Sequence, residues 1–220
     1  MTVMRYIRLM LMTATVWCLT ACDGVMGSFY DDAESSQSAT YGFLSRSDGT
    51  NTGRVYVDGT KYDRWMYINF HNCTIDSAII GDNTPEPAQW DIAIHRYDVK
   101  TNGGAVMATP FSTISDLIAA GRMPTGTFTE DVKNDSVTCD LSQMMQGAAK
   151  YARTHVNRVL RWIILDMSTM PPGYVVNKNV FIIRLKDGTY AAVQLYSYMN
   201  SSSVKGHITF DYVYPLNLNP

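Results

Sequence analysis

The stretch of this chain that decides its fold is Val180-Phe181-Ile182-Ile183-Arg184-Leu185-Lys186-Asp187-Gly188-Thr189-Tyr190-Ala191-Ala192-Val193-Gln194-Leu195-Tyr196-Ser197-Tyr198. Two runs rich in β-branched and aromatic residues, which favour strands, flank a short polar segment that contains Asp-Gly. Asp-Gly is a typical hairpin turn pair because glycine accepts positive φ angles. We therefore expect Val180–Leu185 and Thr189–Tyr198 to pair as an antiparallel hairpin.

Similar runs recur along the chain from Ala39 onward, separated by turn residues. Arg54-Val55-Tyr56-Val57 leads into Asp58-Gly59, and a second run extends from Tyr62 to Phe70, which predicts another hairpin. Alternating apolar and polar residues predict strands at Trp90–Tyr97 and His207–Tyr214. A strongly apolar run favours a third strand at Arg158–Asp166.

Helical signals are few. Ser115–Gly121 favours two turns of helix ended by its glycine, and Leu141–Tyr151 favours another short helix. Strands at nearly regular spacing with few helices predict an all-β, antiparallel fold, and they leave a barrel and a sandwich both open.

The N-terminus has the layout of a bacterial lipoprotein signal. Arg5 and Arg8 precede an apolar run of about 11 residues, Leu9–Leu19, which is too short to span a bilayer. Leu19-Thr20-Ala21-Cys22 then reads as a lipobox, so we expect cleavage after residue 21 and a lipid on Cys22. A plain secretory peptide with a chance cysteine, or an uncleaved anchor, is the alternative.

The rest of the chain divides into a tether and one domain. Residues 22–38 are small, polar and acidic, cannot bury much apolar surface, and are typical of a flexible tether. Residues 39–220 have the length and apolar content of a single β domain with a full core. No second apolar run approaches 18 residues, so we expect membrane attachment through the lipid only.

The charge and the motifs exclude several function classes. Removing residues 1–21 takes away two arginines and no acidic residue, which lowers the formal charge from −2 to −4 and argues against a nucleic-acid partner. The chain has no G-x-S-x-G, H-E-x-x-H, P-loop or dinucleotide motif, and its four histidines are scattered. We therefore do not expect an enzyme.

Two cysteines remain in the mature domain once Cys18 leaves with the signal and Cys22 takes the lipid. Cys73 and Cys139 form an even pair in an exported protein, so a disulfide and two buried free thiols are both open. No C-x-x-C or Cys/His spacing suggests a structural zinc site.

Methionine gives a lead towards function, because nine of the 13 lie after the signal. Met66 and Met199 fall in alternating strands and suit a core. Met123 and the pair Met144-Met145 fall in turn-rich polar segments, where gap-filling thioethers are seldom needed. Thioethers on loops can bind soft metals and haem iron, and the alternative is that these residues line an apolar pocket.

Three segments resemble the HmuY family of haem-binding lipoproteins from anaerobic Bacteroidetes. They are Trp90–Arg96 with Val99–Gly104, Met170-Pro171-Pro172-Gly173-Tyr174-Val175-Val176-Asn177-Lys178-Asn179-Val180, and Gly206-His207-Ile208-Thr209-Phe210-Asp211-Tyr212-Val213-Tyr214-Pro215. The resemblance covers Tyr41 to Pro215. It implies an antiparallel β domain that holds one haem between loops at one end. It also implies an outer-membrane lipoprotein, exposed at the cell surface or also released, that takes haem from host haemoproteins and delivers it to a TonB-dependent outer-membrane receptor.

The resemblance also bears on the axial ligands, which are histidines in some members and methionines in others. They fall in the variable stretch, here Ala105–Met167, whose only histidine is His155. A bis-histidine site cannot be built there, so we expect Met123 and Met145 to be the axial pair, with Met144 and His155 as alternates.

Methionine ligation would favour ferrous haem, because a thioether is a softer and weaker donor than imidazole. The competing function is a surface adhesion or glycan-binding lipoprotein of the same fold without haem, for which tyrosines would stack on sugar rings.

Overall fold

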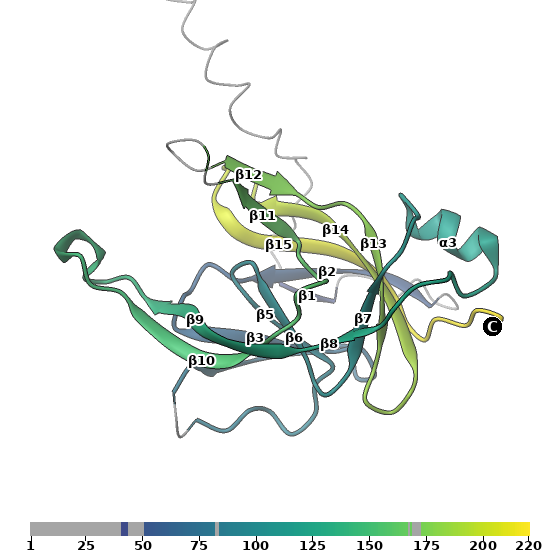
Figure 1. Ribbon diagram of the computed structural model, residues 1–220, viewed down its shortest axis with the longest axis horizontal. Coiled ribbons are helices and arrows are strands. Elements are labelled where there is room, and N and C mark those ends of the chain that lie inside the picture. The colour runs from purple at the N-terminus through teal and green to yellow at the C-terminus, as the bar shows by residue number, and fades with distance from the viewer. Residues whose placement is uncertain (1–40, 44–50, 82–83, 167, 169–172) are drawn as a thin grey trace, which may run out of the picture. The chain divides into compact units, whose positions relative to one another are not determined.

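The computed structural model describes residues 41–43, 51–81, 84–166, 168 and 173–220 (Figure 1). The expected signal, Cys22 and the tether lie outside these residues. Antiparallel strands dominate the described part, with one short α-helix, so the all-β prediction is confirmed. Among the described residues, no helix has the length and apolarity needed to cross a membrane.

The larger sheet has seven strands in the order β1-β2-β15-β14-β13-β7-β8. Their bounds are β1 Gly42–Phe43, β2 Thr52–Asp58, β15 Lys205–Val213, β14 Tyr190–Met199, β13 Val180–Arg184, β7 Ala105–Ala108 and β8 Thr129–Glu130. Each neighbouring pair is antiparallel.

A second sheet has four strands in the order β4-β3-β5-β6, with bounds Thr74–Ile79, Arg64–Asn69, Ile92–His95 and Asp98–Thr101. Its residues Ile68, Ile92 and Val99 share one buried cluster with Val55, Phe181 and Phe210 of the seven-stranded sheet. The two sheets therefore pack face to face, as in a sandwich.

Two separate hairpins complete the domain. The first pairs β9 (Val132–Asp140) with β10 (Lys150–Val156), and the second pairs β11 (Ile163–Asp166) with β12 (Gly173–Val176). They follow each other along the chain with only residues 157–162 between them.

The expected hairpin at 180–198 is confirmed. β13 and β14 pair from Val180↔Gln194 to Arg184↔Tyr190, and Gly188 takes the positive φ of 86°. Asp187 Oδ1 accepts hydrogen bonds from Thr189 N (3.0 Å) and Thr189 Oγ1 (2.7 Å), which fixes the turn.

The expected hairpin around Asp58-Gly59 is wrong. β2 pairs with β1 and β15, whereas β3 pairs with β4 and β5 in the other sheet. Gly59 N donates to Gly206 O (2.8 Å), and Asp58 Oδ1 accepts from Thr60 N (3.0 Å). The segment therefore carries the chain from one sheet to the other, because both strands bury their apolar faces against longer-range partners.

Helix α3 (Ile114–Ala120) confirms the helix expected there. Thr113 Oγ1 accepts from Asp116 N (3.0 Å) at its start, and Gly121 ends it at φ 65°. The helix expected over 141–151 is wrong: one 3₁₀ turn, η2 (Met144–Gln146), joins β9 to β10. Of the strand expected at 158–166, only the part from Ile163 is extended.

Candidate functional site

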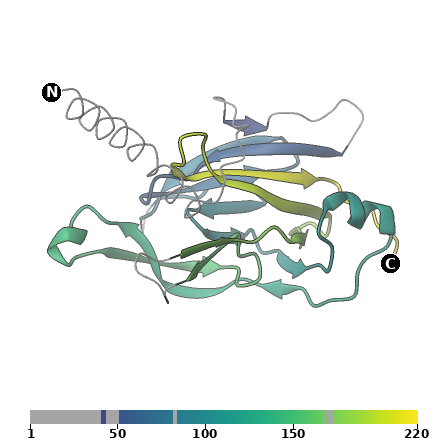
Figure 2. The ribbon, with the colours of Figure 1, turned by 90° about the horizontal axis from the view of Figure 1, so that it is seen from above.

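The two free hairpins are the part of the fold that is not absorbed into the sandwich. The β9–β10 hairpin extends away from the domain on the side opposite α3, as Figures 1 and 2 show, whereas β11–β12 lies against the main core through Ile163, Tyr174 and Val176. The half of β9–β10 nearest the domain is packed, since Val137 and Val156 are buried in a cluster with Trp65, Tyr67 and Trp90. Towards its tip the hairpin leaves this cluster, and residues 142–148 are all exposed.

Two methionines occupy the tip of the first hairpin. Met144 and Met145 form η2, and the turn closes where Gly147, at φ 75°, donates from its N–H to Met144 O (2.9 Å). Their side chains are 58% and 91% exposed, so neither thioether fills a core gap. An apolar, polarisable side chain held in solvent on a fixed turn is suited to meeting a ligand.

The second hairpin presents apolar side chains as well. Ile164 and Val175 are cross-strand partners, so they lie on one face, and they are 44% and 54% exposed. Six of the ten exposed large apolar side chains among the described residues belong to these two hairpins: Val132, Met144, Met145, Tyr151, Ile164 and Val175. This concentration makes the hairpin pair the candidate binding region.

A hollow of about 220 Å³ lies where the two hairpins join the domain. It is lined by Tyr97 and Asp98 of the β5–β6 turn and by the connection between the hairpins, including Val156, Leu160 and Ile163. Its volume is below that of typical small-molecule pockets, so this hollow by itself would not enclose a large ligand.

The structure does not bring Met123 and Met145 together. Met123 follows α3, is partly buried against the cluster that contains Met107 and Leu117, and donates from its N–H to Asn219 O (2.7 Å). Both Figures 1 and 2 place α3 and the β9–β10 tip on opposite sides of the domain. The geometry therefore gives Met123 a packing role, and Met144 and Met145 remain the ligand candidates.

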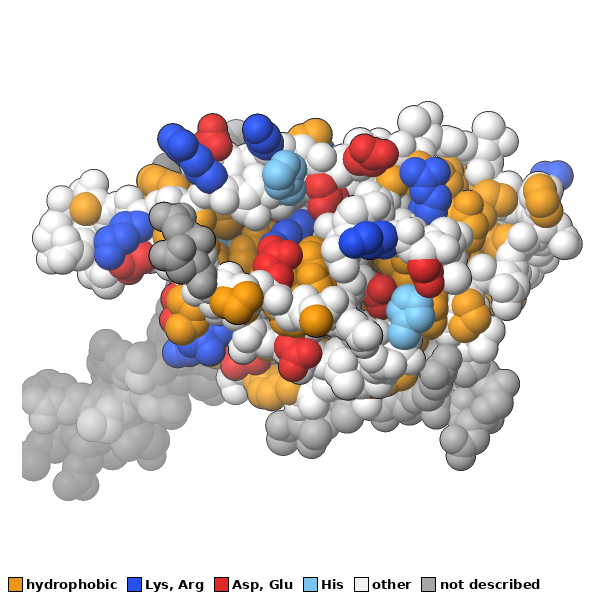
Figure 3. Space-filling model, turned by 90° about the horizontal axis from the view of Figure 1, so that it is seen from below, with side chains coloured by type: hydrophobic (Ala, Val, Ile, Leu, Met, Phe, Trp, Pro, Cys, Tyr) orange, Lys and Arg blue, Asp and Glu red, His pale blue; other side chains and the backbone are white. Residues whose placement is uncertain are grey.

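His155, the alternate ligand, faces a different hollow. It lies on β10 and lines a polar cavity of about 420 Å³ with Glu86, Lys100, Glu130 and Asp131. Lys100 is buried there and pairs with Glu86. Figure 3 shows acidic, basic and apolar side chains interspersed across the lower face, without an extended basic surface.

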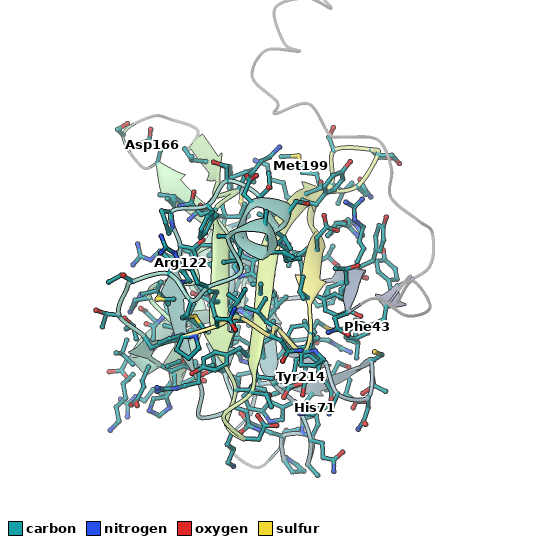
Figure 4. The ribbon with its side chains drawn as sticks, turned by 90° about the vertical axis from the view of Figure 1, so that its right-hand side faces the viewer. Phe43, His71, Arg122, Asp166, Met199 and Tyr214 are labelled. Atoms are coloured by element: carbon teal, nitrogen blue, oxygen red, sulfur yellow. The ribbon has the colours of Figure 1, made fainter. Side chains whose placement is uncertain are left out.

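A histidine cluster lies at the other end of the domain from Asp166, the last residue of β11 (Figure 4). His71 pairs through Nδ1 with Asp91 Oδ2 (3.2 Å) and through Nε2 with Asp187 Oδ2 (2.9 Å), and its ring contacts Tyr214. Partial burial lowers the pKa of His71, but the hydrogen bonds with Asp187 and Asp91 outweigh it and raise the pKa above 6.5. Both ring nitrogens of His71 are hydrogen-bonded, so the cluster links the two sheets.

The two cysteines of the domain lie among the described residues. Cys73 and Cys139 are both free thiols, so the disulfide is not formed. The described part of the chain has no group of three or more His, Cys, Asp or Glu side chains placed to hold a metal ion.

Sequence reasoning missed two polar residues at the base of the first hairpin, Asp131 and Asn157. They are joined by a hydrogen bond from Asn157 Nδ2 to Asp131 Oδ1 (2.9 Å). They are 26 residues apart, and neither lies in a recognisable motif. The one local signal was Asn157 itself, directly before the expected strand Arg158–Asp166, because asparagine is common in turns.

Comparisons with known proteins agree with this architecture. A family model described as HmuY protein matches residues 61–212. A candidate HmuY-like heme-binding protein from Bacteroides vulgatus is 45% identical, with a TM-score of 0.78, over 81% of this chain and 100% of its own. A candidate lipoprotein from Bacteroides fragilis is 42% identical, with a TM-score of 0.77, over 82% of this chain and 99% of its own.

A more distant structure, the apo HmuY analog of Tannerella forsythia, is 25% identical with a TM-score of 0.61, over 83% of this chain and 97% of its own. No curated protein sequence gave a significant match. The matched model spans most of the chain and includes both hairpins and every sandwich strand from β3 to β15, and the chain therefore belongs to the HmuY family.

Proposed function

We propose that this protein binds haem between the β9–β10 and β11–β12 hairpins, with a thioether of Met144 or Met145 as an axial ligand. The observation that carries the proposal is the exposure of these two methionines on a fixed turn, 58% and 91%, at the tip of a free hairpin. Membership of a haem-binding, non-enzymatic family supports the same ligand.

The side chains present fit a porphyrin. Haem is a flat, largely apolar ring that needs apolar contact on both faces and a donor for its iron. Ile164 and Val175 offer apolar contact from one hairpin, and Tyr151 with the two methionines offers contact and soft donors from the other. When bound, the haem iron would gain and lose axial ligands, and the protein would bind and release haem without altering the porphyrin.

The wider role in the proposal is haem capture and transfer. A lipid on Cys22 would keep the domain at the outer membrane, host haemoproteins would be the source, and a TonB-dependent receptor would be the acceptor. The exposed, two-walled site suits transfer, because a ligand held between hairpins can leave when they separate. Transfer is measured by mixing the protein with haemoglobin under reducing conditions and following the haem spectrum.

Haem titration of the reduced protein tests the proposal. We expect a sharp Soret shift that saturates at one haem per chain and tighter binding to ferrous than to ferric haem. The double variant Met144→Ala/Met145→Ala removes the proposed axial thioether, so it should turn a six-coordinate spectrum five-coordinate. It should weaken ferrous binding by at least about 10-fold, the lower end of what loss of an outer partner alone costs. Both residues are changed because either could replace the other.

Variants of the other methionines test which residues bind the iron. Met123→Leu should leave affinity and spectrum unchanged, because that side chain packs on the opposite side of the domain. Met167→Leu and Met170→Leu belong in the same series, since they come from the chain between β11 and β12, outside the described residues. If wild-type protein binds no haem, the adhesion or glycan-binding function replaces this one; if the double variant keeps a six-coordinate spectrum, His155 is tested next.

A further inference from the structure

The two missed residues, Asp131 and Asn157, close the base of the β9–β10 hairpin. Asp131 directly precedes β9 and Asn157 directly follows β10. Asn157 Nδ2 donates to Asp131 Oδ1 (2.9 Å) and to Thr129 O (3.0 Å). The two strands are therefore joined at their root by a side-chain bond beyond the last rung of the ladder, Val132↔Val156.

The same two residues attach the hairpin to the four-stranded sheet. Asp131 Oδ2 accepts a hydrogen bond from Thr101 N (2.6 Å), and Asn157 N donates to Val99 O (2.7 Å). Thr101 and Val99 both belong to β6, the strand that β10 contacts. The root of the hairpin is thus held at two points on one edge of the sandwich.

Asn157 also begins the connection to the second hairpin. Its Oδ1 accepts from Val159 N and Leu160 N, both at 3.0 Å, which turns the chain towards β11. Leu160 and Trp162 are then buried in the main core, 1% and 4% exposed, three residues and one residue before Ile163. One side chain therefore sets where the first hairpin ends and where the second begins.

The Asn157 amide is fully used. Both amide hydrogens and both acceptor positions of the oxygen have partners, and the residue is 4% exposed. Removing the amide leaves buried N–H and C=O groups without partners, which is more costly than the bond is worth when present. Replacing Asn157 alone should therefore change the geometry of both hairpins.

We propose that Asp131 and Asn157 are positioning residues that set the placement of the two hairpins, and through it the haem affinity. This inference rests on the proposed function, because the two hairpins that the pair positions are the elements proposed to hold haem. Neither residue is an axial ligand in the proposed site. They act as outer partners do in metal sites, by fixing the elements that carry the contacts.

The experiment compares Asn157→Ala and Asp131→Asn with wild type, below the unfolding temperature of each variant. Backbone hydrogen exchange is measured over 132–156 and 173–176, and ferrous haem is titrated into the same samples. We expect faster exchange in both hairpins, unchanged exchange in β13 and β14, and roughly 10- to 100-fold weaker haem binding, as for outer partners of metal ligands.

Two further variants separate positioning from general destabilisation. Asn200→Ala is the matched control, because Asn200 Oδ1 also accepts two backbone N–H groups, from Ser202 and Val204 (both 2.9 Å), but in the β14–β15 connection. It should leave haem affinity unchanged. The swapped pair Asp131→Asn/Asn157→Asp keeps the side-chain bond with donor and acceptor exchanged and should recover part of the affinity.

The outcomes distinguish this inference from the function beneath it. If wild type binds haem and Asn157→Ala matches it in affinity and in exchange of both hairpins, the positioning role is wrong while the function stands. If Asn200→Ala weakens haem binding as much as Asn157→Ala, the effect is not specific and the inference also fails. If wild type binds no haem, the function fails, and the hydrogen exchange alone decides whether the pair holds the hairpins.

Discussion

At the scale of single residues, burial separates the methionines into two groups. Met107 and Met199 are 1% and 6% exposed and fill the core, whereas Met144 and Met145 lie in solvent on η2. A thioether on the surface loses the favourable transfer that burial would give it. The exposed Met144 and Met145 therefore contribute little to packing, and this observation is the basis of the ligand proposal.

His71 gives a residue-scale prediction about pH. Its folded-state pKa is raised above 6.5, so its contribution to stability is complete below pH 6.5 and is lost as pH rises through the folded-state value. We expect His71→Gln to destabilise the protein at about pH 5.5 and to approach wild type near about pH 8.5. Since the side chain is 39% exposed, solvent screening limits the effect to about 1 kcal/mol or less.

Urea unfolding at several pH values measures this difference. His155→Gln, which removes an exposed histidine outside the cluster, should show no such convergence with wild type. A stability difference for His71→Gln that is constant across the pH range would contradict the assigned role of the Asp91 and Asp187 contacts.

At the scale of elements, the Gly103-Gly104 pair explains how β7 reaches its place in the sheet. Gly103 adopts φ 68°, and a Cβ on Gly104 would lie 2.4 Å from Arg184 O. Arg184 is the β13 partner of Ala105, so the close approach of the two backbones needs the missing side chain. This gives a physical reason for two glycines in a segment that resembles the family.

Gly104→Ala is the corresponding prediction. The added methyl group meets backbone, which cannot move aside as a flexible side chain would, so we expect a loss of about 1–3 kcal/mol in the free energy of unfolding. Thermal or chemical unfolding measures it. Gly81→Ala is the control, because its Cβ would meet only Thr84 Oγ1 at 3.4 Å, and equal losses in both variants would refute the explanation.

At the scale of the whole molecule, the expected membrane anchor and the proposed haem site lie in different parts of the chain. The described domain contains no membrane-spanning helix, and the expected anchor is a lipid on Cys22. Several acyl chains hold a protein at a membrane because each buried methylene contributes about 0.8 kcal/mol. We therefore expect the domain to bind haem equally well with or without its anchor.

Cys22→Ala tests the anchor. The variant should move from the membrane fraction to the soluble fraction of fractionated cells, with unchanged haem affinity of the recovered protein. Continued partition with membranes would rule out lipid anchoring at Cys22. Protease treatment of intact cells, read on the wild-type protein, reports whether the domain faces outward.

The sequence by itself determined the strands whose turns are local: the Asp187-Gly188 hairpin, the buried face of β15 formed by Ile208, Phe210 and Tyr212, and α3 with its terminal Gly121. These depend on residues close in sequence, so propensity and alternation are enough. It also identified the family.

Only the tertiary structure decided which strands pair and where the candidate methionines lie in the domain. Asp58-Gly59 has the local pattern of a hairpin turn, yet β2 pairs with β15, 151 residues away at Val57↔Ile208. Met123 and Met145 are equally loop-like in sequence and fall on opposite sides of the domain. Such choices depend on burial between distant segments, which no short stretch of sequence records.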